Sequence, residues 1–436
     1  MMRIQRPLVI LLPKLKDDMH KSCLIVFLAI YSFSFSQQID FRKFTEELCS
    51  PQFHGRGYVN HGDSIASNYI AGAFKQVGLE PLSNSNDSFF QSFSFPVNTF
   101  PGDMAVKIDS MQLIPGIHFL IDPASAGYSG ELILKFVSIA DLYNQRIDAS
   151  KWPSSQALIA RNLGFSGDTI PKVKQYLQKL ANQIPIVEIV NSKLTWSVSS
   201  SKLNFPYLII QDSVLGAIPE KITMNIEAEF KSIHHARNVI GFLPGSKKNA
   251  KTIVFSAHYD HLGRMGREVY FPGANDNASG TAMLVYLANY FKRKPVKFNV
   301  VFIAFAGEEA GLLGSEFFVS NPLIQLQDIR FLINLDIMGS GEEGITAVNG
   351  TLFEKELLLL QNINKKQKAL PVIKKRGPAA NSDHYFFTEA GVPAFFIYTM
   401  GFNKNYHDIF DTYANLSFEA FEKIGKLLIA FTKKLN

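Results

Sequence analysis

Apolar runs of strand length recur in the second half of the chain, and helical stretches separate the last three of them. The runs are Asn238–Leu243, Thr252–Ala257, Asn299–Ala306 and Phe331–Leu335, and the helical stretches are Gly280–Arg293 and Leu312–Ser320. Strands this apolar are typical of a sheet that is buried on both faces. Alternating strands and helices therefore predict an α/β fold with a mostly parallel, mixed central sheet covered by helices on both faces.

The first half of the chain has a different texture. A helix is predicted over Asp63–Leu79, where apolar residues recur at helical spacing and Gly78 closes the run. Short strand-like runs then surround one helical stretch, Ile170–Gln183, which indicates a small mixed sheet with a helix. We therefore expect one domain built from residues 37–99 and 232–436, interrupted by a smaller β-rich insert at 100–231.

The N-terminal residues resemble a targeting signal. Lys21 precedes the apolar run Cys23–Phe33, and small residues follow at Ser34–Ser36. The run is too short to span a bilayer, so residues 1–36 are predicted to be a cleaved signal peptide, with translation starting at Met19. The mature protein is then exported to the periplasm or the medium and has no membrane anchor. The alternative is a buried N-terminal strand.

Cysteine and charge exclude other classes. Removal of the signal leaves Cys49 as the one cysteine, so neither an intrachain disulfide nor a cysteine zinc site is expected. The net charge is +6, and half of this excess lies in residues 1–36, which hold five basic and two acidic residues. No concentrated basic stripe remains, and nucleic-acid binding is not expected.

Polar side chains follow the predicted strands at their carboxyl ends, where functional groups of such sheets collect. His258 and Asp260 come directly after one strand, and side chains two residues apart there point the same way. Asp276 lies among small residues that let the backbone approach a bound ion. Taken singly, each has an ordinary interpretation: an isolated histidine on the surface, or an aspartate that caps the following helix.

Three further carboxylates and one histidine also lie at or after the carboxyl ends of predicted strands. Glu308 and Glu309 come after a buried strand, Asp336 ends another, and His407 follows the apolar stretch Val392–Thr399. Adjacent glutamates at a helix N-terminus are common, but an unpaired buried carboxylate such as Asp336 needs a partner. Two histidines and three carboxylates form a ligand set that zinc favours, and a shared carboxylate would place two ions about 3.5–4 Å apart.

The motifs around these residues resemble the M28 family of zinc peptidases, which includes leucyl aminopeptidases and glutamate carboxypeptidases. The matching stretches are SAHYDHLG (256–263), PGANDNASGTA (272–282), FAGEEAGLLGS (305–315), NLDIMG (334–339), SDHYFF…GVPAFF (382–396) and YHDIFDT (406–412). Upstream, residues 55–81 resemble the N-terminal helix of these enzymes. The order of strands and helix in the insert is similar to that of a protease-associated (PA) domain.

The resemblance implies two zinc ions per chain and a role for each residue. His258 and Asp336 would bind one ion, Glu309 and His407 the other, and Asp276 both, followed by a cis peptide bond to Asn277. The remaining roles would be catalytic: general base for Glu308, orientation of His258 for Asp260, and stabilisation of the oxyanion for Tyr406.

The expected function is hydrolysis of peptide substrates by a metal-bridging water, and we favour an aminopeptidase. A carboxypeptidase would need a basic pocket, and Arg264, Arg267 and Arg376 are the arginines near the motifs. Two alternatives remain: a glutaminyl cyclase-like enzyme with one zinc, and a non-catalytic binding module on a peptidase fold. The loop Gly263–Gly273 is expected to shape the specificity pocket.

Overall fold

The structure is a computed structural model that describes residues 39–82, 88–162 and 169–435. The predicted signal peptide lies outside the described residues, and export stays a prediction. No helix in the described ranges is long and apolar enough to cross a membrane. Cys49 is buried and has a free thiol.

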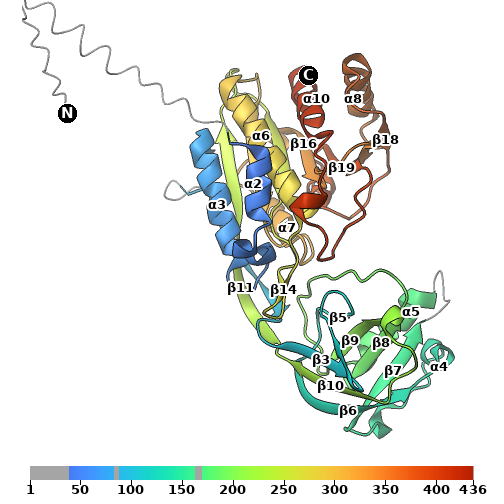
Figure 1. The fold of residues 1–436 in the computed structure, drawn as a ribbon. Helices are drawn as coiled ribbons and strands as arrows, with labels where there is room; N and C mark the ends of the chain where they lie inside the picture. Colours follow the sequence, from blue (N-terminus) through green and yellow to red (C-terminus); the bar gives the residue numbers. More distant parts are fainter. Residues whose placement is uncertain (1–38, 83–87, 163–168, 436) are drawn as a thin grey trace, which may run out of the picture. The chain divides into compact units, whose positions relative to one another are not determined.

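One sheet holds nine of the described strands (Figure 1). They are β1 (Glu80–Pro81), β2 (Phe90–Thr99), β11 (Glu229–Leu243), β12 (Thr252–His258), β15 (Asn299–Phe305), β16 (Ile329–Asp336), β17 (Gly344–Val348), β18 (Ile373–Lys375) and β19 (Ala394–Met400). Their spatial order is β1-β11-β15-β12-β16-β19-β17-β18, with β2 paired to β11 as well.

The centre of this sheet is parallel, as predicted. β12 pairs in parallel with β15 and β16, and β16 pairs in parallel with β19. β11 runs antiparallel to its neighbours, whereas β17 is antiparallel to β19 and parallel to β18, so the sheet is mixed. The apolar run Asn238–Leu243 is the end of the long antiparallel strand β11. Its composition matched that of the parallel strands because it is buried in the same way.

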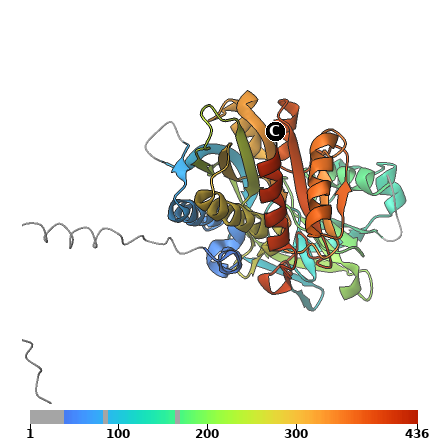
Figure 2. The ribbon, with the colours of Figure 1, turned by 90° about the horizontal axis from the view of Figure 1, so that it is seen from above.

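Helices cover both faces of the sheet. One face packs against α2 (Phe41–Leu48), α3 (Gly62–Val77), α6 (Ser279–Arg293), α8 (Glu354–Gln367) and α10 (Phe421–Lys434). On this face α10 lies between α6 and α8 (Figure 2). The opposite face packs against α7 (Leu313–Ser320) and α9 (His384–Glu389). The predicted α/β architecture is therefore confirmed.

A second sheet is built from residues between β2 and β11. Its strands are β3 (Met104–Ile108), β4 (Met111–Leu113), β5 (Phe119–Ile121), β6 (Tyr128–Phe136), β7 (Gln156–Asn162), β8 (Ile186–Val190), β9 (Tyr207–Gln211) and β10 (Lys221–Ile226). Helices α4 (Ile139–Tyr143) and α5 (Thr169–Leu180) pack against it. We call residues 100–231 the insert; their kinship with PA domains stays a prediction.

The insert joins the first sheet through two neighbouring strands and a shared core. β2 leads into the insert and β11 leads out of it, and the two strands pair with Thr99 opposite Glu229. The hydrophobic core of the insert also contains Leu262, Met265 and Phe271, which belong to the loop after β12. This loop carries the short hairpin β13 (Arg264–Met265) and β14 (Val269–Tyr270). The insert therefore packs directly on a segment that follows His258.

Candidate metal centre

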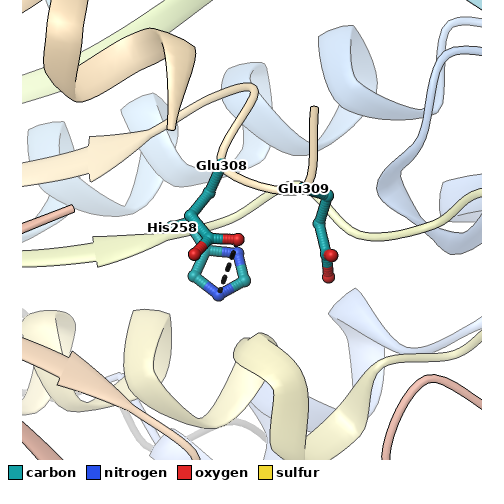
Figure 3. Close-up of side chains that lie close together, drawn as sticks. All are labelled: His258, Glu308 and Glu309. Carbon is teal, nitrogen blue, oxygen red and sulfur yellow. Dashed lines mark ion pairs between the residues drawn. The ribbon is translucent and has the colours of Figure 1, made fainter. Parts of the chain in front are cut away.

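The parallel strands deliver the predicted side chains to one edge of the sheet. β12 ends at His258 and β16 ends at Asp336. Gly307, whose φ of 68° lies in the left-handed region, turns the chain after β15 into Glu308 and Glu309. Glu308 lies at the imidazole of His258, and the adjacent Glu309 points away from Glu308 (Figure 3). The neighbouring glutamates therefore serve different positions.

Asp276 lies in the loop before α6, and hydrogen bonds hold this loop in place. The backbone N–H groups of Asn275 and Asp276 donate to the carboxylate of Asp411 at 2.9–3.1 Å. The peptide bond between Asp276 and Asn277 is cis, as the resemblance implied. The side chain of Asn277 donates to the carbonyl of Leu335, which ties this loop to the end of β16.

Each carboxylate oxygen of Asp276 faces one imidazole. Oδ1 lies 3.2 Å from Nε2 of His258, which is itself 3.5 Å from Oδ2 of Asp336. Oδ2 lies 3.2 Å from Nε2 of His407, which is also 3.2 Å from Oε2 of Glu309. The structure thus brings all five predicted ligand residues together as two groups that share one carboxylate.

The charges of the two groups suit bound cations. Burial opposes protonation of both imidazoles, but the carboxylates around them raise the pKa of His407 to about 11 and that of His258 well above its usual value. Burial alone would raise the pKa of Asp276, yet the two imidazoles hold it well below its usual range. Among the described residues, Oδ1 of Asp336 has no hydrogen-bond partner. Nitrogen and oxygen donors in this arrangement fit zinc.

Glu308 has the environment of a proton carrier. Its Oε2 lies 4.0 Å from Nε2 of His258. Burial is the largest cause that raises the pKa of Glu308 well above its usual range, and Glu309 adds to the effect while His258 opposes it. A carboxylate with a raised pKa beside candidate metal ligands is suited to take up and release a proton.

Asp260 makes contacts that differ from the expected one. Nδ1 of His258 lies 3.1 Å from the backbone carbonyl of Asp260 and 3.9 Å from its carboxylate, so the carbonyl is the closer partner. The carboxylate instead accepts from the hydroxyl of Tyr58 at 2.8 Å and from the backbone N–H groups of Glu308 and Glu309 at 3.2 and 3.3 Å. Asp260 therefore anchors the turn that carries both glutamates.

Part of the chain matches a known protein family, and most of the chain shares its fold with solved structures. The model of peptidase family M28 matches residues 238–432, which contain all eight predicted site residues. The chain is 27% identical over 254 residues to aminopeptidase YwaD of Bacillus subtilis (strain 168), covering 54% of this chain and 53% of that protein. It is 31% identical over 245 residues to a probable leucine aminopeptidase of Trichophyton verrucosum, covering 52% and 61%.

The chain matches peptidase family M28 over residues 238–432, which is less than half of its length. It spans about half to three fifths of the length of the curated relatives named above. A zinc aminopeptidase from Bacillus subtilis shares the fold of this chain with a TM-score of 0.66 at 17% identity, over 91% of this chain and 94% of that one. An aminopeptidase from Aneurinibacillus sp. strain AM-1 matches with a TM-score of 0.61 at 19% identity, over 92% and 95%.

One histidine at the candidate metal centre was not predicted. His261 is fully buried, and its Nδ1 lies 2.8 Å from Oε1 of Glu309. Its ligand atom groups with those of Asp276 and Glu309 within 4.8 Å. The residue stands in the HYDH stretch (258–261), but its position after the end of β12 does not indicate where its ring points. His261 is placed to orient Glu309.

Tyr406 borders the centre from the solvent side. Its side chain is 48% exposed, and its ring stacks on the imidazole of His407 with centroids 3.9 Å apart and planes at 12°. Burial of its hydroxyl and then the nearby Asp276 and Glu309 carboxylates raise its pKa. The hydroxyl therefore stays protonated and able to donate a hydrogen bond.

A buried arginine supports the loops of the candidate metal centre. Arg56 is fully buried, and its guanidinium donates to several backbone carbonyls. The acceptors are Tyr259 at 2.7 Å, Leu48 at 3.0 Å, Pro272 at 2.7 Å, Gly273 at 2.6 Å and Asp276 at 3.5 Å. This one side chain therefore ties the loop after His258 to the loop that carries Asp276.

The buried histidine His384 should make the free energy of unfolding depend on pH. Burial lowers the pKa of His384 to about 4, whereas in the unfolded chain it is about 6.5. Between pH 6.5 and 4 the unfolded chain binds a proton that the folded chain does not. The contribution of His384 to the free energy of unfolding is therefore complete above pH 6.5. It falls by about 3 kcal/mol as the pH is lowered to 4.

We expect the free energy of unfolding of His384→Gln to fall less between pH 6.5 and 4, because glutamine does not titrate. Denaturant unfolding at a series of pH values between 4 and 7 measures the slope. The exposed His235 provides the matched substitution, His235→Gln, which should leave the slope as in the wild type. An unchanged slope in His384→Gln contradicts the prediction.

Proposed function

We propose that this protein is a zinc-dependent exopeptidase of family M28 with two zinc ions per chain, and that it acts as an aminopeptidase on peptide substrates. The observation that carries the proposal is the position of Asp276, whose two oxygens face two separate imidazole groups. One carboxylate shared in this way is the arrangement that two-metal hydrolases use. The names of the relatives, which include aminopeptidases, support the choice of activity.

The proposal gives each side chain one task. His258 and Asp336 would hold one zinc ion, His407 and Glu309 the other, and Asp276 both. Bound zinc supplies polarisation of the scissile carbonyl and a lowered pKa of water. Glu308 accepts the proton of the attacking water at its carboxylate and passes it to the leaving amine. The hydroxyl of Tyr406 donates a hydrogen bond to the developing oxyanion.

The arginines near the motifs argue against a carboxypeptidase. Arg267 lies 3.4 Å from Asp103 and 3.8 Å from Glu227, two acidic residues of the insert. Arg376 donates to the hydroxyl of Tyr398 at 3.2 Å, and Arg264 lies over the ring of Tyr270. Each of these cations already has a partner, so the recognition of a substrate carboxylate would have to displace it. A free amino terminus needs no such cation.

Substrates that differ at one end test the activity. We expect hydrolysis of aminoacyl substrates with a free amino group and at least tenfold slower hydrolysis of their N-acetylated forms. Liberated amino acids are measured for both series and for N-blocked peptides with a free carboxylate. Faster cleavage of the N-blocked peptides would contradict the aminopeptidase proposal. Release of pyroglutamate by an enzyme with one zinc would indicate a cyclase instead.

The substitution Asp276→Asn tests the shared carboxylate. We expect the wild type to retain two zinc ions per chain after dialysis and Asp276→Asn to retain at most one. The reason is that the neutral amide offers a single weak oxygen donor where the carboxylate offers two charged ones. Elemental analysis gives the stoichiometry. Asp328→Asn, at an exposed aspartate paired with Lys251, is the control that should keep both ions. Two retained ions in Asp276→Asn would exclude a shared role.

A further inference from the structure

A segment of the insert reaches the metal centre. Residues 191–203, which we call the strap, leave the insert after β8 and return to it before β9. The strap has no regular secondary structure along most of its length. Several of its hydrogen bonds leave the insert and go to β2 and to two loops of the first sheet, one of which carries His407 and the other Glu309.

The backbone of Trp196 holds His407 in two places. Its N–H donates to the carbonyl of His407 at 2.8 Å, and its carbonyl lies 2.9 Å from Nδ1 of the His407 ring. A carbonyl only accepts, so Nδ1 must carry the hydrogen of this bond. Nε2, which faces Asp276 and Glu309, is therefore the ring nitrogen left to bind a metal.

Lys193 fixes the loop on both sides of that histidine. Its ammonium group forms an ion pair with the buried carboxylate of Asp408, the residue after His407. The same group donates to the carbonyls of Lys404 at 2.8 Å and Tyr406 at 3.4 Å. One side chain of the strap therefore binds three residues of the loop that bears the ligand.

The strap is itself anchored at Trp196. The indole is 6% exposed, and its Nε1 donates to the carbonyl of Ile121 in the insert at 2.7 Å. The ring stacks on Phe271, from the loop after His258, with centroids 4.8 Å apart. Further along, the hydroxyl of Ser200 donates to the carbonyl of Ala310 at 3.3 Å, next to Glu309. The position of the carbonyl that meets His407 is therefore set by the core of the insert.

We infer that the insert is a structural part of the metal centre, and that Trp196 and Lys193 are positioning residues that act through His407. The inference rests on the proposed function, because it needs a metal at the group of Asp276, Glu309 and His407. It extends that function by assigning to the insert a part in metal retention. Among the described residues, no hydrogen bond or ion pair joins the strap to His258 or Asp336, so one of the two ions should depend on the strap more than the other.

The two tryptophans of the chain provide a matched test. Trp196→Phe keeps an aromatic ring against Phe271 and removes the bond to Ile121. Trp152→Phe removes an equivalent bond, from Nε1 to the carbonyl of Gln156 at 3.2 Å, elsewhere in the insert. Competition with a fluorescent chelator measures zinc affinity. We expect one of two zinc ions to bind about tenfold more weakly in Trp196→Phe, and both to bind as in the wild type in Trp152→Phe.

If the strap affects zinc binding, zinc binding must in turn affect the strap. In Trp152→Phe the remaining tryptophan is Trp196, so its emission reports on the strap alone. Removal of zinc should shift this emission to longer wavelength as the indole gains contact with water, and added zinc should restore it. Equal emission with and without zinc would contradict the inference.

Lys193 provides a second variant that does not depend on the core of the insert. Its side chain is 45% exposed, so Lys193→Met should fold. We expect weaker binding of the same zinc ion as in Trp196→Phe, with Lys202→Met, an exposed position of the strap, as the unaffected control. Zinc affinity equal to that of the wild type in both Trp196→Phe and Lys193→Met overturns the inference and leaves the proposed function intact. A wild type that binds no zinc overturns both.

Discussion

Glu308→Gln should lower the turnover of an aminoacyl substrate by about 10²–10⁴-fold and leave two zinc ions bound. Glutamine has nearly the same size as glutamate but cannot accept a proton from water. Burial and Glu309 raise the pKa of Glu308 well above its usual range, so this carboxyl suits proton transfer. The variant separates this role from metal binding, because the proposed ligands are all retained.

The measurement combines kinetics with metal analysis on one preparation. Glu316→Gln makes the same substitution at an exposed position of α7 and should retain wild-type turnover and zinc content. A loss of zinc from Glu308→Gln would indicate that Glu308 is a ligand. Turnover within tenfold of the wild type would show that another group moves the proton.

Arg56→Met should lower the free energy of unfolding by about 4 kcal/mol, the largest effect on stability that we expect. Methionine fills much of the same space but leaves carbonyls of Leu48, Tyr259, Pro272 and Gly273 without their donor. A buried acceptor without a partner costs about 1–3 kcal/mol, and relaxation of the loops offsets part of the sum.

Chemical denaturation of the zinc-loaded protein tests this expectation. Arg146→Met removes an arginine whose side chain is 68% exposed, and should change stability by less than about 0.5 kcal/mol. Arg56→Lys should fall between Arg56→Met and the wild type, because an ammonium group has fewer donors than a guanidinium. Equal stability of Arg56→Met and the wild type would mean that water replaces the guanidinium without cost.

Much of the candidate centre was predictable because strand ends are visible in the sequence. His258, Glu308 and Asp336 each follow a run of buried apolar residues, and parallel strands bring such ends to one edge. The direction of β11 was not predictable from its residues, since burial on two faces makes antiparallel and parallel strands equally apolar. The pairing partner alone distinguishes them.

Residues that support the centre through tertiary contacts could not be predicted from the sequence. Arg56 binds carbonyls more than 200 positions away, and carbonyls carry no sequence signal. The key atom of Trp196 is also a backbone carbonyl, so any residue there could supply it. Only the fold shows that this carbonyl meets His407. Asp260 was found by its spacing, but the spacing did not reveal that its carboxylate serves the glutamate turn.

The pairing of Thr99 with Glu229 has a consequence for engineering. Because the chain leaves and rejoins the first sheet at adjacent positions, a short hairpin turn could replace the whole insert without rethreading any strand. Such a minimal protein would keep all five predicted ligands, Asp276 among them, and lose the Trp196 carbonyl that accepts from Nδ1 of His407. Excision is thus neutral for topology, and its effect would fall on the loops that the insert contacts, including the one that orients the His407 imidazole.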